Sequence, residues 1–270
     1  MSIRNILQEF HFNKKPKTIG RPSTIQQVLE QLDGIIDRSI ATNDRTGYFA
    51  YLYRRVTAEI LKEVQLGNFE DNERMEIFDV AFANYYLDAY NAHTNHTEIG
   101  LAWDYVFNSK TESLTILQHL LLGVNVHINL DLALTATTVM KDTQISLIES
   151  DFMKVNAILG AMVNEMQDRL SKVSPLLFVL DVLGKNTDEK IINFSLEKAR
   201  EFSWAHANLL WGMGSNHQIS AIKEMDRAVL QLGMFIKDPK SKFIGYALNF
   251  IAMFEENQVG KVISKLRKDS

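Results

Sequence analysis

No proline interrupts this chain between Pro22 and Pro175. A proline in the interior of an α-helix costs about 3 kcal/mol, so this interval can carry long, unbroken helices. Apolar residues recur there every three or four positions, which is the spacing of a helix that buries one face. The first such run is formed by Ile25, Val28, Leu29, Leu32, Ile35, Ile36 and Ile40. The sequence therefore predicts an all-α fold.

The same spacing, together with residues that favour helix ends, predicts the other helices. They are expected over residues 44–60, over 71–90, around 103–107 with Thr97 as the cap, from 112, from 142 to 173, from 174 to 184, from 187, from 215 to 237 and from 240 to 268. No repeat, low-complexity tract or long flexible linker divides the chain. We therefore expect one domain over residues 1–270, with residues 1–21 as an N-terminal extension and roughly eight to ten helices.

Residues 118–132 read QHLLLGVNVHINLDL and place polar, metal-binding side chains inside one of the most apolar stretches of the chain. From Val124 to Leu132 apolar and polar residues alternate, and this period alone predicts a β-strand. A lone strand among helices would leave its backbone hydrogen-bonding groups unpaired, so we predict a helix instead. Apolar residues would then surround this helix, so we expect residues 117–134 to form the central, mostly buried helix of the fold.

In a helix, residues four positions apart are neighbours on one face. His127 then lies beside Asp131, while Asn125 lies beside Asn129 on roughly the opposite side. A buried imidazole and carboxylate need partners, because an unsatisfied polar group costs about 1–3 kcal/mol. Such a pair is expected either to hold a ligand or to fix the packing of the core.

One hypothesis is a metal site. His119 lies two turns before His127, near the same face, and a further ligand is expected from the helix over 71–90, where Asp79 and Glu76 lie among apolar residues. Two imidazoles with carboxylates suit zinc or non-haem iron, with a position left for water. The alternative is that Asp131 accepts a hydrogen bond from His127 and that the pair only bridges helices.

Asp79 is flanked by Phe78 and Val80, so we expect it to be buried and its pKa to be raised unless a neighbouring arginine pairs with it. Arg54 and Arg74 could neutralise an anionic substrate near this carboxyl group. Ion pairs with nearby acidic residues are the simpler explanation of such arginines.

The C-terminal half offers aromatic residues in place of a further motif. Trp204, His206 and Trp211 share one predicted helix and are expected to contribute mainly to stability, because such residues more often pack in a core than bind a substrate. The amphipathic segment 240–268 is expected to pack on the body of the protein rather than on a membrane.

Composition excludes several classes of function. A net charge of −4 argues against nucleic acid as the main partner. The chain has no cysteine, which excludes disulfides and thiolate zinc sites. No signal peptide and no run of about eighteen apolar residues is found, so no transmembrane segment is expected and the chain is predicted to be cytoplasmic. Walker A, G-x-S-x-G and H-E-x-x-H motifs are also missing from the sequence.

Four segments resemble a known family: RTGYFAYLYRRVTAEI at 45–60, RMEIFDVAFANYYLDAY at 74–90, LQHLLLGVNVHINLDLAL at 117–134 and AREFSWAHANLL at 199–210. They look like the bacterial family catalogued as domain of unknown function 5995, over about residues 25–235. The resemblance implies a bacterial source and a helical fold, and it brings no established activity.

Two functions fit the sequence. In the first, the protein is a metal-dependent hydrolase of a phosphoester or similar anionic small molecule. Its zinc or iron ion would be held by His119, His127 and Asp131, Asp79 would be a ligand or a base, and bound water would be the nucleophile. In the second, it is a non-catalytic helical ligand-binding or scaffold protein whose histidine, aspartate and asparagine side chains fix the packing of a polar core. Whether the protein is an enzyme is left open by the sequence.

Overall fold

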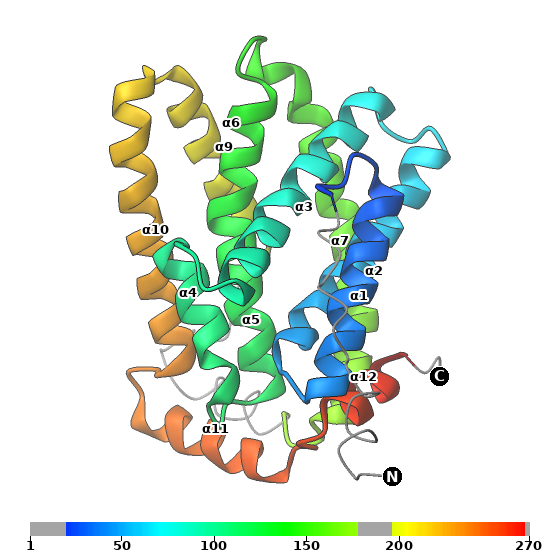
Figure 1. Ribbon diagram of the computed structural model, residues 1–270, viewed down its shortest axis with the longest axis vertical. Coiled ribbons are helices and arrows are strands. Elements are labelled where there is room, and N and C mark those ends of the chain that lie inside the picture. The colour runs from blue at the N-terminus through cyan, green and yellow to red at the C-terminus, as the bar shows by residue number, and fades with distance from the viewer. Residues whose placement is uncertain (1–19, 178–195, 268–270) are drawn as a thin grey trace, which may run out of the picture.

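The fold is built from helices (Figure 1). The computed structural model describes residues 20–177 and 196–267, and within these ranges it has eleven α-helices and no strand. The all-α prediction is confirmed, with one helix more than the expected eight to ten. The helices are α1 (Ile25–Thr42), α2 (Thr46–Gln65), α3 (Asn72–Thr94), α4 (Leu101–Asn108), α5 (Ile116–Val126), α6 (Leu132–Val139), α7 (Glu149–Val173), α9 (Leu196–Gly212), α10 (Ser215–Lys237), α11 (Lys242–Phe254) and α12 (Val259–Arg267).

The helix α5, a π-helical turn at His127–Asp131 and the helix α6 follow one another without a break at the centre of the bundle. Figure 1 shows this continuous helix with α9 and α10 on one side and α1, α2 and α3 on the other. The α5 part packs on α2, α4 and α10, and the α6 part packs on α3 and α9. The prediction of a helix rather than a strand over residues 124–132 is therefore confirmed, although one turn of it is wider than an α-helical turn.

By length and composition this central helix, Ile116–Val139, could cross a membrane, and it is the one such helix in the described part of the chain. However, 72% of its most apolar window is buried inside the protein. A helix that is apolar on all sides is equally typical of the core of a globular fold. The burial identifies Ile116–Val139 as the core helix of this bundle.

Two predicted helix starts are corrected by their caps. The helix expected from residue 112 begins at Ile116, because the side chain of Thr115 accepts from the backbone N–H of Gln118 and the side chain of Gln118 accepts from that of Thr115. This capping box satisfies donors that the first turn of a helix leaves unpaired. The short helix expected to be capped by Thr97 begins at Leu101, after Gly100.

The helix predicted over residues 240–268 is two helices, α11 and α12. Between them lies Glu255, which is 8% exposed and accepts from the backbone N–H of Ile116 (2.7 Å) and from the hydroxyl of Ser174. Glu255 therefore ties the end of α11 to the start of α5 and to the end of α7. Ser174 ends α7 instead of starting a helix, and the predicted helix over 174–184 lies mostly in residues 178–195, outside the described ranges.

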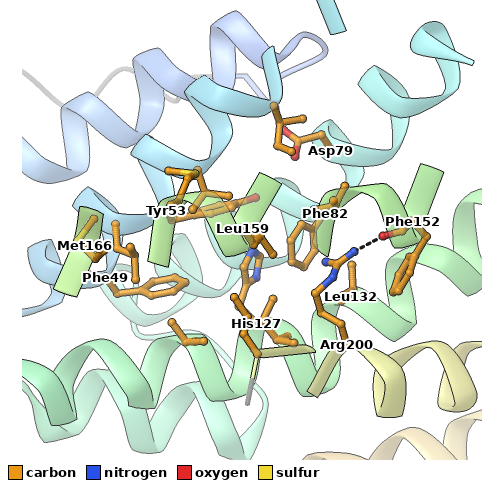
Figure 2. A pocket seen from close by; sticks show the side chains of 18 of the residues that line it. Phe49, Tyr53, Asp79, Phe82, His127, Leu132, Phe152, Leu159, Met166 and Arg200 are labelled. Carbon is orange, nitrogen blue, oxygen red and sulfur yellow. Dashed lines mark hydrogen bonds between the residues drawn. The ribbon is translucent and has the colours of Figure 1, made fainter. Parts of the chain in front are cut away.

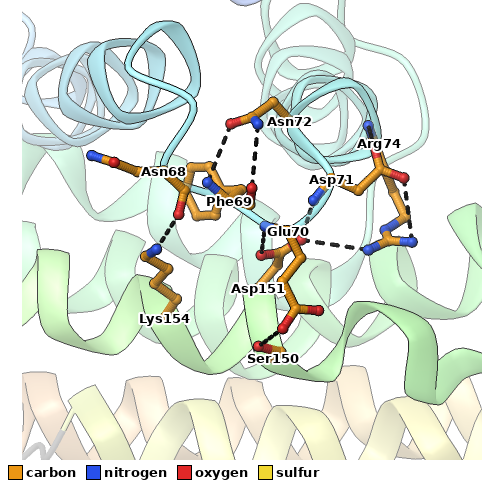
Figure 3. Close-up of polar contacts among 9 residues, drawn as sticks. All are labelled: Asn68, Phe69, Glu70, Asp71, Asn72, Arg74, Ser150, Asp151 and Lys154. Atoms are coloured by element: carbon orange, nitrogen blue, oxygen red, sulfur yellow. Dashed lines mark hydrogen bonds and ion pairs between the residues drawn. The ribbon is translucent and has the colours of Figure 1, made fainter.

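A polar joint attaches the start of α3 to α7 (Figure 3). Both carboxylate oxygens of Asp151 accept backbone N–H groups, from Glu70 at 2.7 Å and from Asp71 at 3.1 Å. Arg74 reaches the same carboxylate at 3.4 Å and also pairs with Asp71. Asp151 is only 1% exposed, so this joint fixes one end of α3 inside the fold.

Candidate functional site

His127 and Asp131 form a buried pair at the π-helical turn. Nδ1 of His127 lies 2.9 Å from Oδ2 of Asp131, and the same oxygen accepts from Nε1 of Trp103 on α4 at 3.0 Å. The adjacency predicted for these two residues is confirmed, and so is the bridge between helices. With the carboxylate as acceptor, Nδ1 carries the proton and Nε2 keeps a lone pair. π-Helical turns frequently occur at functional sites.

Burial sets the protonation of this pair. It lowers the pKa of His127, while the hydrogen bond to Asp131 opposes the change. It raises the pKa of Asp131, opposed by the bonds from His127 and Trp103. A neutral imidazole is therefore the favoured form of His127, and its Nε2 is a hydrogen-bond acceptor.

Aromatic rings fix the orientation of His127. The ring of Phe82 stacks on the imidazole with 3.7 Å between centroids and 10° between planes. The ring of Tyr53 meets it edge-on at 4.4 Å, and Phe49 does so at 5.7 Å. These contacts come from α2 and α3, so the imidazole lies in the tightly packed centre where α5, α2 and α3 meet.

A cavity of about 250 Å³ lies on this side of the core helix, between α2, α3, α7 and α9 (Figure 2). Phenylalanine, leucine, isoleucine, valine and methionine side chains make up most of its wall. Its polar lining residues are Tyr53, Asp79, His127, Gln167 and Arg200. We call this space the central cavity.

Three polar atoms in the wall of the central cavity are buried and have no hydrogen-bond partner among the described residues. They are Oη of Tyr53, Oδ2 of Asp79 and Nε2 of His127. Native structures pair about nine in ten buried polar groups, so each of these three unpaired atoms requires an explanation. Figure 2 shows the three side chains and Phe82 around the same part of the cavity.

The three groups differ in what they can offer a ligand. Burial, with a smaller effect from Glu76, raises the pKa of Asp79 to about 7, so this carboxyl group can carry a proton near neutral pH. Burial, and then the nearby Asp79, keeps the pKa of Tyr53 well above its usual value, although the neighbouring hydroxyl of Thr57, which is outside hydrogen-bond geometry, acts in the opposite direction. Tyr53 therefore offers a donor, His127 offers an acceptor, and Asp79 offers both when it is protonated. No arginine of the described residues pairs with Asp79, so the arginine partner considered for it is not found there.

Arg200, on α9, contributes a buried guanidinium group to the wall. It is 3% exposed, donates to Oδ1 of Asn156 and to the backbone oxygen of Phe152, and lies over the Phe152 ring at 4.5 Å. Burial lowers the pKa of Arg200 to about 9, a value at which the group is still charged at neutral pH. The sequence analysis missed this residue as a site candidate, because nothing in the run AREFSWAHANLL sets one arginine apart.

The structure does not bring all the predicted metal ligands together. His119 lines a separate, smaller space with Trp103 and Phe107, and Phe49 borders both spaces. The Phe49 ring lies directly against Gly123, halfway along the chain between His119 and His127, where an added Cβ would come within 2.4 Å of it. Within the described residues no three histidine, aspartate or glutamate side chains are grouped as metal ligands. His127 and Asp79 share the central cavity, and His119 does not line it.

The predicted anion-binding arginines also lie elsewhere. Arg54 pairs with Asp33 through two contacts, at 2.8 and 3.1 Å, and Arg74 belongs to the Asp151 joint. Neither arginine lines the central cavity. Of the three residues proposed for catalysis, Asp79 alone is at the cavity.

The aromatic residues of α9 make the packing contacts expected of them. The Trp204 ring lies 4.9 Å from that of Phe152, and Nε1 of Trp211 donates to the backbone oxygens of Met140 and Thr143. His206 is half-buried and bonds within its own helix. Their effect on stability is still a prediction.

The core helix with a polar pair, set beside an apolar cavity, defines an all-α protein with a candidate small-molecule site. The sequence pattern of a family of unknown function, DUF5995, matches residues 25–239, so the chain belongs to that family. This confirms the family resemblance found in the sequence. No curated protein and no solved structure matches the chain.

Proposed function

We propose that this protein binds an apolar small organic molecule in the central cavity. The observation that supports the proposal is the presence of three unpartnered polar groups, on Tyr53, Asp79 and His127, in the wall of an otherwise apolar cavity. Small-molecule sites typically have this composition, with a mainly apolar lining and a few polar groups that orient the ligand. A hydroxyl or carbonyl group on the ligand would pair with these side chains.

Energetics and size agree with this function. Each unsatisfied buried group costs about 1–3 kcal/mol, so a ligand that pairs with two or three of them would gain several kcal/mol in addition to burying its own apolar surface. An apolar protein cavity of about 150 Å³ admits benzene. At about 250 Å³, the central cavity is suited to a molecule larger than a single ring.

The proposal is tested with N-phenyl-1-naphthylamine, a neutral dye whose fluorescence rises in apolar surroundings. We expect saturable binding near one dye per protein. The variant Leu159→Trp should weaken it, because Leu159 lines the cavity and a larger side chain would fill it. Leu147→Trp is the matched control, since Leu147 is 52% exposed and does not line the cavity.

Circular dichroism should confirm that both variants are folded. Equal dye binding by the two variants, or no saturable binding by the unaltered protein, would contradict the proposal.

Metal-dependent hydrolysis of a small molecule is the second candidate. It is supported by Nε2 of His127 and Oδ2 of Asp79, two atoms of the kind that bind zinc, which are both unpartnered at one cavity. Metal analysis of protein purified without an affinity tag tests it. A stoichiometric ion that is lost in His127→Ala would favour this candidate, and a metal content equal to that of His127→Ala would exclude it.

A further inference from the structure

Arg200 brings a positive charge to the wall of the central cavity, and no acidic side chain of the described residues forms an ion pair with it. Arg200 has five N–H donors and uses two of them, on Asn156 and on the backbone of Phe152. Burial is the one cause that shifts its pKa. Both of its acceptors are neutral, so they bond the guanidinium group without neutralising it.

Three half-buried arginines are paired with acids, whereas half-buried Arg45 donates to the backbone oxygens of Lys110 and Glu112. Arg74 contacts Asp71 and Asp151, Arg55 contacts Glu165, and Arg54 contacts Asp33. Arg200 is more buried than these three and has a neutral environment instead. A buried charge is costly unless it is paired, so this position favours an anion that comes from outside the chain.

The wall beside Arg200 limits the kind of anion. Figure 2 shows the guanidinium group between Leu132 and Phe152, with Phe82 and Leu159 close by. All four of these lining residues are apolar. Asp79, whose pKa is raised to about 7, is mostly protonated below pH 7, and burial lowers the pKa of His127 and favours its neutral imidazole. A multiply charged phosphoester would have to lose its hydration here with one cation to pair with, whereas a single carboxylate matches one guanidinium group in charge and geometry.

We propose that the ligand of the central cavity is an apolar carboxylic acid whose carboxylate pairs with Arg200 and whose hydrocarbon part lies along the apolar wall. This inference rests on the proposed function and narrows it from an apolar molecule to an apolar monoanion. A polar substituent on the hydrocarbon part would reach Tyr53, Asp79 or His127.

Displacement of the bound neutral dye separates the two proposals. Decanoic acid and 1-decanol, which have the same chain length and differ in charge, are titrated into the dye complex at pH 6, below the pKa of Asp79. We expect the acid to displace the dye at a concentration at least about tenfold lower than the alcohol, because a hydrogen bond to a charged group is worth about 1.5–3 kcal/mol and 1.4 kcal/mol is tenfold in affinity.

Variants of Arg200 test whether the preference for the acid over the alcohol depends on its guanidinium group. Arg200→Gln should lower the preference for decanoic acid over decanol by about tenfold or more, while Arg200→Lys should keep part of the preference. Arg227→Gln is the control, because Arg227 is exposed and does not line the cavity.

An acid-to-alcohol ratio near one in the unaltered protein overturns the inference, and it does so even if Arg200→Gln fails to fold. A preference for the acid that survives in folded Arg200→Gln overturns it as well. In both cases dye binding persists and the proposed function stands. Loss of dye binding by the unaltered protein would instead remove the proposed function itself.

Discussion

The imidazole of His127 lies parallel to the ring of Phe82, with 3.7 Å between their centroids. One face of the imidazole is covered by this stack, and one nitrogen is held by Asp131. Rotation of the ring would break both contacts, so the direction of Nε2 is set before any ligand arrives. Such preorganisation lowers the ordering cost of binding.

Loss of the Asp131 carboxylate should destabilise the core. We expect Asp131→Asn to lower the free energy of unfolding by about 1–3 kcal/mol, because His127 and Trp103 both donate to Oδ2 in a site that water does not reach. Urea denaturation measures the change. Asp142→Asn, at an exposed position, should change it by less than about 0.5 kcal/mol. Equal effects of the two variants would show that the buried pair adds little to stability.

Asp79 should make stability depend on pH. Its pKa is about 7 in the folded protein and near 3.8 when unfolded, so between these values the folded state binds more protons. The free energy of unfolding then falls as pH rises from about 4 to about 7, and each pKa unit corresponds to about 1.4 kcal/mol. Asp79→Asn removes this titration and should gain stability relative to the unaltered protein at pH 8 but not at pH 4.5.

Urea denaturation at the two pH values, with Asp142→Asn as the exposed control, measures this difference. A stability difference between Asp79→Asn and the unaltered protein that is the same at both pH values would contradict the raised pKa.

Two glycines of the helices should respond to alanine in opposite directions. A Cβ at Gly123 would lie 2.4 Å from Cγ of Phe49, so Gly123→Ala should destabilise by about 1–3 kcal/mol. A Cβ at Gly34 meets nothing within 4 Å, so Gly34→Ala should stabilise by up to about 1 kcal/mol through helix propensity. Thermal melting compares the variants. If Gly123→Ala is as stable as the unaltered protein, the Phe49 ring can move aside. This ring would then not keep the space lined by His119 separate from the cavity lined by His127.

The contacts of Asp151 that join α3 to α7 should contribute to the stability of the fold and not to binding in the central cavity. Asp151→Asn replaces one acceptor oxygen by a donor opposite a backbone N–H, so we expect a loss of about 1–3 kcal/mol. Binding of the neutral dye should persist in the folded fraction, because Asp151 does not line the cavity. Asp168→Asn, exposed on the same helix, is the control for urea denaturation. Lost dye binding in folded Asp151→Asn would show that the joint shapes the cavity.

The fold could be predicted largely from local patterns. Helical spacing and the run without proline act within a few turns, and they predicted the helix class, the central position of residues 117–134 and the His127–Asp131 contact. Helix ends were less predictable. The helix α11 ends at Glu255, whose carboxylate bonds Ile116, 139 residues away in the chain, and such a distant contact is not visible in a local pattern.

The site was also predictable only in part, because some of its contacts join residues that lie far apart in the sequence. His127 and Asp79 stand out in the sequence as polar residues in apolar runs. Arg200 does not, because its partners Phe152 and Asn156 lie 48 and 44 residues earlier. The convergence of His119 with His127 was expected from their spacing, but His119 lines a separate space, and Phe49, from another helix, borders both spaces.

The π-helical turn at His127–Asp131 gives the core helix two rotational phases. A π turn uses one residue more than an α turn, so side chains after it are rotated by about 100° relative to the phase of α5. The side chains of α5 pack on α2, α4 and α10, and the side chains of α6, which are rotated by the turn, pack on α3 and α9. Deletion of a single residue in this turn would restore one phase and turn Thr135 and Ala136 away from their buried positions. A change in the length of this turn is therefore expected to disturb the core more than a substitution at Asn129, its one half-buried residue.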